Sequence, residues 1–266
     1  MNPKRLIFTF FLIFGLLCGL SFGQSPPKNL NLYKNGEKLT YEGSFSKLLL
    51  RGIDIADLSF TVYNSPDKED LFIKAEAKSK GTLLKLFSFS FYQKVESTID
   101  ADSFNILKTV KRDEQGDRVR DSEAVFDYDS EKVTYVETNP KDPQRPPRRV
   151  ASTINNETQD LISGLYALRR LPFAVGKTFT LSVSDSGMVY QVPVRVTGRE
   201  KQKTVLGKVM CWRIEPDIFG ENRMIEQKGE MTIWITDDNR RLPVRSKIET
   251  KLGKVEIKLR KVERAK

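Results

Sequence analysis

The sequence predicts a mainly β protein, built as a single strongly curved antiparallel sheet or a partly open β-barrel with one central helix. Apolar and polar residues alternate along about ten segments, a number within the ordinary range for one large sheet. Turn signals separate the segments, for example at residues 64–67 and 185–187. Sixteen Phe and eight Tyr against two Trp also favour strands, because aromatic side chains pack well on a pleated surface.

Residues 1–23 have the features of a signal peptide. Lys4 and Arg5 form a short positive start, and an apolar run follows at residues 6–20. Small residues then precede a predicted cleavage site before Gln24. We therefore expect an exported protein that is periplasmic and soluble once the signal is removed.

Two alternatives to a cleaved signal remain open. A permanent membrane anchor is disfavoured because the apolar run is shorter than the ~20 residues that a spanning helix needs. Lipidation of Cys18 is disfavoured because Leu17 stands where a lipoprotein signal has a small residue.

After the signal, residues 24–36 are polar and include two adjacent prolines, which predicts a tether. Residues 37–264 are predicted to form a single β-rich domain. The strand pattern is clearest near its two ends, at residues 39–45 and 255–259, where apolar residues or glycine occupy every second position. Such alternation is typical of antiparallel strands that expose one face to water.

One apolar segment combines two patterns. Its start, with Leu83, Leu86 and Phe87, resembles a helical turn. Its end alternates Phe89 and Phe91 with serines, as a strand does.

The middle of the chain departs from the strand pattern. Residues 139–157 contain four prolines together with Arg145, Arg148 and Arg149, which predicts a long exposed loop. Residues 158–171 are then predicted to form the central helix, capped by a threonine and stopped by a proline. The apolar face of this helix consists of Leu161, Leu165 and Leu168.

The central segment at residues 159–170 resembles the central motif of the bacterial family called domain of unknown function 3108. Leu39 and Tyr41 match the opening strand of that family, and residues 233–235 match its late tryptophan strand. The resemblance covers residues 37–259 as one domain. It implies an exported protein, and it brings no catalytic residues, since none are established for the family.

Composition excludes much of enzyme chemistry. The chain has no histidine, which rules out Ser-His-Asp and Cys-His arrangements and imidazole-bound zinc. Apart from Cys18, the only thiol is Cys211, in an alternating segment where a lone cysteine is usually a small buried hydrophobe. Three aspartate pairs lack the context that acid–base or metal chemistry needs. We therefore expect no enzyme activity, no cofactor and no metal; the alternative is an enzyme that relies on carboxylates or Cys211 alone.

The function that we expect is non-catalytic: an envelope protein that binds or chaperones a hydrophobic or lipid-type ligand, either a lipid or a lipidated protein. A strongly curved sheet with a helix over it can leave an apolar cavity. The predicted cavity lining is Leu83, Leu86, Phe87, Phe89, Phe91, Leu161, Leu165 and Leu168. The competing interpretation is that these side chains form an ordinary core. The layout also resembles the periplasmic lipoprotein carriers, an analogy of fold that does not fix function.

The alternative function is that of a structural or interaction protein with a basic docking surface. The net charge is +10, and Arg145, Arg148 and Arg149 are the candidates for contact with an anionic envelope surface or a partner. Charges of this kind are also typical of a plain solvated face. Nucleic acid is not expected as a partner, because no binding motif is present. The oligomeric state is left open.

Overall fold

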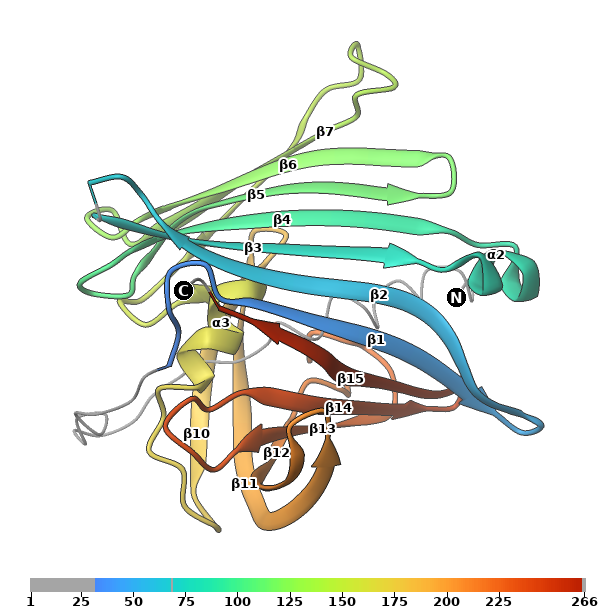
Figure 1. The fold of residues 1–266 in the computed structure, drawn as a ribbon. Coiled ribbons are helices and arrows are strands. Elements are labelled where there is room, and N and C mark those ends of the chain that lie inside the picture. The colour runs from blue at the N-terminus through green and yellow to red at the C-terminus, as the bar shows by residue number, and fades with distance from the viewer. Residues whose placement is uncertain (1–31, 68, 265–266) are drawn as a thin grey trace.

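In the computed structural model, which describes residues 32–67 and 69–264, the chain forms one large sheet around a buried helix (Figure 1). The strands are β1 (Lys38–Lys47), β2 (Leu50–Asn64), β3 (Asp70–Ser79), β4 (Phe91–Asp100), β5 (Ile106–Gln115), β6 (Arg118–Asp127), β7 (Lys132–Thr138), β8 (Arg148–Thr153), β9 (Gln159–Asp160), β10 (Thr178–Asp185), β11 (Met188–Thr204), β12 (Gly207–Pro216), β13 (Gly229–Thr236), β14 (Pro243–Thr250) and β15 (Gly253–Glu263). The helices are α2 (Gly81–Phe87) and α3 (Leu161–Leu168). Mainly β architecture is thereby confirmed.

The fifteen strands lie in the order β8-β7-β6-β5-β4-β3-β2-β1-β15-β14-β13-β12-β11-β10-β9. Every neighbouring pair is antiparallel except β9 and β10, which run parallel. The first and last long strands, β1 and β15, pair in the middle of the sheet, and the two edges are β8 and β9. The sheet is therefore curved and not closed, as the alternation predicted.

The two ends of the curved sheet approach each other without pairing. The side chain of Ser152 in β8 donates a hydrogen bond to the carbonyl of Gly187, in the turn between β10 and β11. Gly187 has a φ of 81°, and a Cβ there would lie 2.6 Å from the Cβ of Tyr135 in β7. Only glycine allows this close approach, so a tight turn bridges the gap that strand pairing leaves open.

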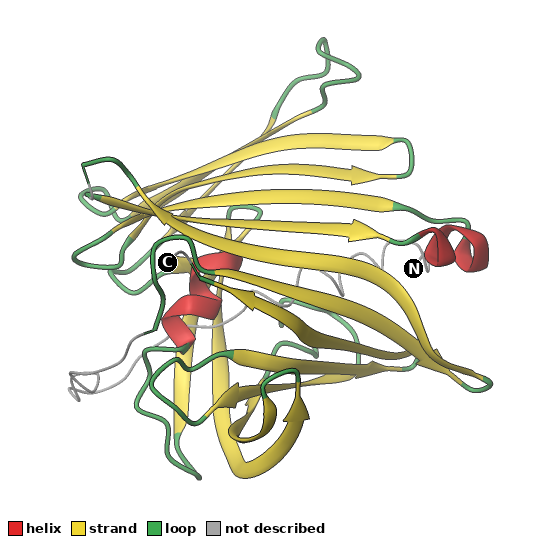
Figure 2. Ribbon diagram, viewed as in Figure 1, coloured by secondary structure: helices red, strands yellow, loops and turns green. Residues whose placement is uncertain are grey.

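The inner face of the sheet forms the hydrophobic core, and α3 lies within the curve (Figure 2). Alternate residues of β1 and β15 are buried on this face, among them Leu39, Tyr41 and Ile257. All eight residues of α3 are buried, including Leu165 and Tyr166. The helix therefore fills one end of the concave side, which a sheet this strongly curved cannot fill with its own side chains.

The central helix is shorter than the predicted range 158–171. It begins at Leu161, because Asp160 and not Thr158 is the N-cap residue and accepts hydrogen bonds from two backbone amides of the first turn. Gln159 and Asp160 form β9 instead. Thr158 is hydrogen bonded to Ser182 of β10, so its hydroxyl is used outside the helix.

Two other elements differ from the prediction. The predicted loop at 139–157 contains β8, because Arg148–Thr153 pairs in register with β7. A second helix, α2, follows β3; the helical turn indicated by Leu83 and Phe87 is correct, and the strand that follows it, β4, begins at Phe91.

The predicted signal peptide, Cys18 and residues 24–31 of the predicted tether lie outside the described residues. The rest of the tether packs on the domain: Leu32 is buried, and the ring of Tyr33 stacks on Phe104 at 5.9 Å between ring centroids. Over the described ranges, none of the helices combines the length and the apolar character required to cross a membrane.

A fully buried ion pair joins the helix to the centre of the sheet. The Arg169 guanidinium, just after α3, lies 3.0 Å from a carboxylate oxygen of Glu37, just before β1, and both side chains are 0% exposed. Arg169 also donates to the carbonyl of Arg240 and lies over the ring of Tyr166 at 5.0 Å. Arg264 approaches the other oxygen of Glu37 at 3.4 Å. The start of the domain, the helix and the last strand therefore meet at one carboxylate.

Candidate functional site

Two pockets lie against the inner face of the sheet. The first, which we call the outer pocket, lies between the β1–β2 hairpin, α2 and the β14–β15 turn, and its volume is about 410 Å³. It is lined by Phe45, Lys47, Leu48, Leu49, Leu50, Ile55, Leu83, Phe87, Leu252 and Val255. Every lining residue except Lys47 is apolar. Both the volume and the lining match those of pockets that bind small hydrophobic ligands, typically about 300–1,000 Å³.

Aromatic packing and a glycine shape the wall of the outer pocket. The Phe45 ring meets Phe87 of α2 edge to face, with 5.3 Å between ring centroids. On its other side, Phe45 packs over Gly253, where a Cβ would lie 2.6 Å from the ring. Gly253 has a φ of 142°, so the tight β14–β15 turn and the position of Phe45 depend on each other.

Helix α2 and the residue before it are fixed to β2 by hydrogen bonds to two backbone carbonyls of that strand. The amide of Lys80 donates to the carbonyl of Ile55 at 2.7 Å, and the Thr82 hydroxyl donates to the carbonyl of Asp54. Leu83 is then completely buried beneath the helix, while Phe87 is half-buried and lines the pocket. The pocket wall is therefore held by regular structure on three sides.

The lip of the outer pocket is exposed apolar surface. Leu48 and Leu49, at the tip of the β1–β2 hairpin, are 88% and 97% exposed, and Leu86 of α2 is 46% exposed. Leucines with this much exposed area are unusual beside one another on a monomer, and such patches typically mark interaction sites.

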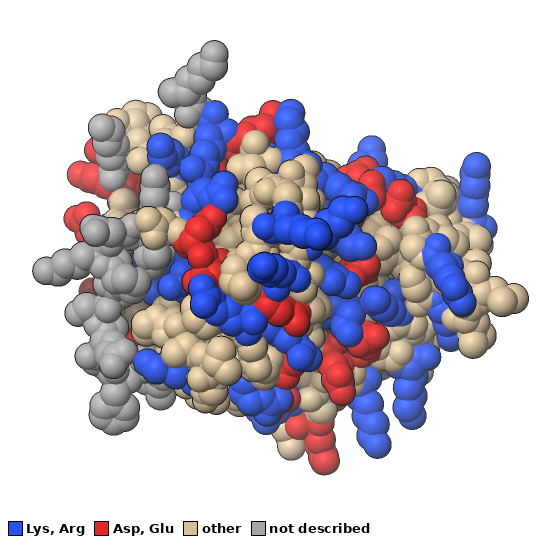
Figure 3. Space-filling view, turned by 60° about the horizontal axis from the view of Figure 1, so that its bottom comes forward, with Lys and Arg blue, Asp and Glu red and all other residues tan. Residues whose placement is uncertain are grey.

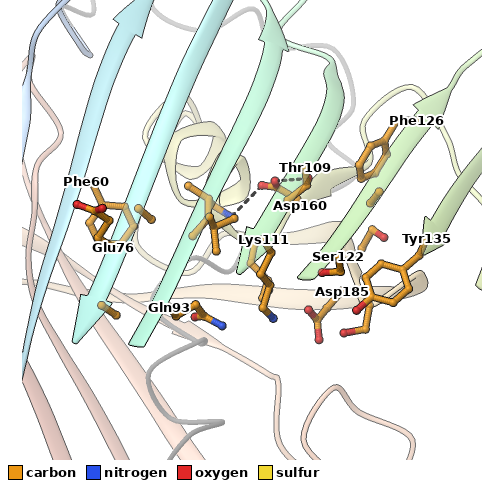
Figure 4. A pocket seen from close by; sticks show the side chains of 18 of the residues that line it. Phe60, Glu76, Gln93, Thr109, Lys111, Ser122, Phe126, Tyr135, Asp160 and Asp185 are labelled. Carbon is orange, nitrogen blue, oxygen red and sulfur yellow. Dashed lines mark hydrogen bonds between the residues drawn. The ribbon is translucent and has the colours of Figure 1, made fainter. Parts of the chain in front are cut away.

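The second pocket, which we call the inner pocket, lies between α3 and strands β2–β7, and its volume is only about 60 Å³. Small side chains such as Ala75 and Ala124 leave this space open. Figure 4 shows Gln93, Lys111 and Tyr135 directed toward it from three strands. The volume is sufficient for a few water molecules and insufficient for a hydrocarbon chain.

Asp160, beside the inner pocket, has a structural role. One carboxylate oxygen accepts from the amides of Ile162 and Ser163, and the other accepts from the hydroxyls of Ser97 and Thr109 (Figure 4). Four donors saturate the carboxylate and attach the start of α3 to β4 and β5. The motif at residues 159–170 therefore supplies both Asp160 and Arg169 as buried anchors of the helix.

Cys211 and the three aspartate pairs line neither the outer nor the inner pocket. Cys211 is buried away from both pockets, and burial raises the pKa of its thiol to about 12. Asp57 pairs with Lys80 at 3.2 Å, and Asp100 accepts hydrogen bonds from Ser103 in a turn. Over residues 32–67 and 69–264, no cluster of three or more acidic or cysteine side chains is arranged to hold a metal ion.

The eight predicted lining residues occupy four environments. Leu83 and Phe87 line the outer pocket, and Leu161 lines the inner pocket. Leu86 is exposed on α2 and lines neither pocket. The other four are core residues that line neither pocket: Phe89, Phe91, Leu165 and Leu168.

Sequence reasoning missed the hairpin tip. Leu48, Leu49 and Leu50 are three consecutive leucines between Lys47 and Arg51, at the point where the alternation of β1 ends. A run of apolar residues between two cations, where a turn is due, is the signal that would have indicated exposed apolar surface.

The predicted docking arginines are all exposed. Arg145 lies in the loop that projects beyond β7, while Arg148 and Arg149 begin edge strand β8 (Figure 1). The guanidinium of Arg148 lies 5.6 Å from the centre of the Tyr135 ring. On the face shown in Figure 3, basic and acidic side chains are intermixed, as the cross-strand ion pairs require.

Comparison with known proteins places the fold. The family model for a protein of unknown function (DUF3108) matches residues 40–260. A β-barrel-like protein of the domain of unknown function DUF1849 from Brucella abortus superposes with a TM-score of 0.56 at 11% identity, covering 86% of this chain and 97% of that chain. This similarity shows a common fold.

Two further solved structures superpose less well. A hypothetical protein from Chlamydia trachomatis gives a TM-score of 0.36 at 10% identity, covering 86% of this chain and 87% of that chain. A protein with a YmcC-like fold from Bacteroides fragilis gives 0.36 at 9% identity, covering 91% of this chain and all (100%) of that chain. No curated protein matches the sequence.

Proposed function

The chain belongs to the DUF3108 family of proteins of unknown function, and we propose that it binds the hydrocarbon part of a lipid, or of a lipid-modified protein, in the outer pocket. The observation that carries this proposal is a 410 Å³ pocket whose lining is apolar except for Lys47. The binding is non-catalytic: the protein holds its ligand and releases it unchanged.

Physical chemistry supports hydrocarbon as the ligand. Each methylene group removed from water contributes about 0.8 kcal/mol to binding. The only polar side chain in the lining of the outer pocket is Lys47, so a polar ligand would lose hydrogen bonds to water with little replacement. A hydrocarbon chain loses none. Lys47, at the lip, is placed to pair with the carboxylate or phosphate of a lipid whose chain lies inside.

We propose the cell envelope as the compartment. The basis is the signal-like sequence of residues 1–23, with its charged start and apolar run. An envelope protein has lipids and lipid-modified proteins within reach, and these are the ligand classes that the apolar lining suits.

The test is a titration with dansylated undecanoic acid in buffer without vesicles. We expect saturable enhancement and a blue shift of the dansyl emission as it enters the pocket. Leu252→Trp places a larger ring at the pocket wall and is expected to weaken binding about tenfold or more, because overpacked space excludes the chain.

Val205→Trp is the matched control, since Val205 is 55% exposed in the β11–β12 turn and lines neither pocket. It should bind as the wild type does. If the wild type gives no saturable signal, or if both variants bind equally, the outer pocket is not the ligand site. Native mass spectrometry of protein purified gently from its own host would then identify any ligand class directly.

A second candidate is a docking function for the arginine-bearing loop, favoured by the projection of residues 139–147 beyond the sheet (Figure 1). Docking of this kind depends on charge and weakens steeply as ionic strength rises. Burial of a hydrocarbon chain does not weaken with salt. The salt dependence of complex formation therefore separates the two functions.

A further inference from the structure

We infer that the β1–β2 hairpin tip and α2 form a membrane-docking surface that inserts its leucines into the interface of an anionic lipid bilayer. We call this surface the docking tip and define it by Leu48, Leu49, Leu50 and Leu86 with the cations Lys47, Arg51, Lys85 and Lys251. The inference goes beyond ligand binding, because docking does not require the outer pocket to hold anything.

Apolar exposure is the first argument. Leu49 is 97% exposed and Leu48 is 88% exposed, so nearly all of their surface contacts water in the isolated chain. The hairpin projects past the end of the sheet, away from the core that could otherwise cover it (Figure 1). Side chains at such a tip reach the acyl boundary of a bilayer before any other part of the molecule does.

The second argument is charge. Lys47, Arg51, Lys85 and Lys251 are exposed around the leucines, and none of them forms an ion pair within the described part of the chain. Elsewhere on the sheet a number of basic side chains are paired with carboxylates, as Arg112 is with Asp121 and Arg245 is with Glu256. In Figure 3 the right-hand end of the molecule, where the hairpin and α2 lie, is tan surface flanked by blue side chains.

Together these features match an anionic bilayer better than a protein groove. Exposed leucines complement the hydrocarbon of a bilayer, and unpaired cations beside them complement its phosphate groups. The negative surface potential of an anionic bilayer attracts basic residues that lie within about one Debye length of it. The same geometry places the mouth of the outer pocket, which shares Leu48 and Leu49 with the tip, against the membrane.

The experiment is co-sedimentation of the purified protein with vesicles of phosphatidylglycerol and phosphatidylethanolamine, compared with vesicles of phosphatidylcholine alone. We expect binding to the anionic vesicles and several-fold less binding to the neutral ones. Leu49→Ser should lower partitioning about tenfold, because it removes one inserted leucine. Leu86→Ser, at a position that lines neither pocket, should lower it by a smaller factor.

Val175→Glu is the matched control for exposed apolar residues. Val175 is 59% exposed and precedes β10, a strand that lies at the opposite side of the molecule from the hairpin tip in Figure 1, and its variant should bind vesicles as the wild type does. Raising the ionic strength from about 0.01 M to about 1 M, which shortens the Debye length from about 30 Å to about 3 Å, should reduce binding several-fold.

Capture of dansylated undecanoic acid, measured on the same variants without vesicles, separates this inference from ligand binding. Vesicle binding that is lowered in Leu86→Ser while capture persists supports the docking tip. Absent vesicle binding by the wild type, or wild-type binding by Leu49→Ser, overturns it even if capture is intact. Concentration-dependent dimerisation that Leu49→Ser abolishes, without vesicle binding, overturns it in favour of a second copy of the chain.

Discussion

Removal of one partner from the Glu37–Arg169 ion pair is expected to cost about 3–5 kcal/mol of unfolding free energy, because the other charge is left buried. Arg169→Met strands the Glu37 carboxylate, whose remaining contact is Arg264 at 3.4 Å. It also removes the hydrogen bond to the carbonyl of Arg240. The free energy of unfolding of a domain is about 5–15 kcal/mol in total, so this loss would be about a fifth of it or more.

The assay is urea unfolding followed by the fluorescence of Trp212 and Trp234, with thermal unfolding as a second measure. In a domain of this size, 3–5 kcal/mol corresponds to a fall in Tm of about 6–20 °C. The double variant Glu37→Leu with Arg169→Met removes both charges and should recover most of the loss, since buried pairs often exchange for apolar residues at little cost.

Arg223→Met is the matched control. Arg223 pairs with Asp217 at 2.9 Å, but the two side chains are 36% and 33% exposed, so the expected cost is about 1 kcal/mol or less. The reasoning is refuted if Arg169→Met costs no more than this control, or if the double variant is less stable than both single variants.

Three further changes test other parts of the structure. Gly253→Ala should cost about 1–3 kcal/mol in urea unfolding, because its φ of 142° strains any other residue and its Cβ would collide with Phe45; a neutral result would mean that the turn relaxes freely. Asp160→Ala should cost about 2–5 kcal/mol and speed hydrogen exchange in α3, since the helix loses its cap and two hydroxyls lose their acceptor; unchanged exchange would contradict this role. A hydrogen bond from Arg260 lowers the pKa of Glu42 from 4.5 to about 2, so its stabilisation is present above pH 4.5 and is lost as the pH falls toward 2. Glu42→Gln should therefore flatten the stability profile in that window, and an unchanged acid slope would count against the pair.

The alternation of apolar and polar residues predicted where the strands lie, but it did not predict which strands pair with each other. The alternation of Leu39, Tyr41 and Phe45 places β1 correctly, and that of Val255 and Ile257 places β15. That these two strands pair depends on contacts across the whole chain, on which periodicity carries no information.

The polar anchors were the hardest part to predict. In the sequence, Arg169 lies near the end of the predicted helix, a position that favours cations in general. In the structure it is fully buried, because a glutamate 132 positions away supplies its partner. Burial of an arginine depends on such a partner, and a single sequence does not identify the partner.

For the candidate site residues too, the sequence predicted local features correctly and did not predict those that depend on tertiary packing. Leu83 and Phe87 were singled out by local apolar excess, and they line the outer pocket. Phe89 and Leu168 have the same local apolar pattern, but they lie in the core. Whether an apolar side chain lines a pocket or packs in the core depends on the tertiary packing around it. Arg148 and Arg149 were assigned to a loop on the strength of nearby prolines, yet their segment pairs with β7.

The pairing of β1 with β15 also determines the order in which the parts of the sheet can form. Within β2 to β8, and within β10 to β14, each strand pairs with the next strand along the chain. Such local hairpins can form quickly, because their contacts close only short loops. The two halves of the sheet, β1 to β8 and β9 to β14, are joined only when the eleven-residue strand β15 (Gly253–Glu263) pairs with β1 and β14. Until β15 has paired with β1 and β14, each half of the sheet has an unpaired edge strand and an exposed apolar face, so this protein is most prone to aggregation before β15 is in place.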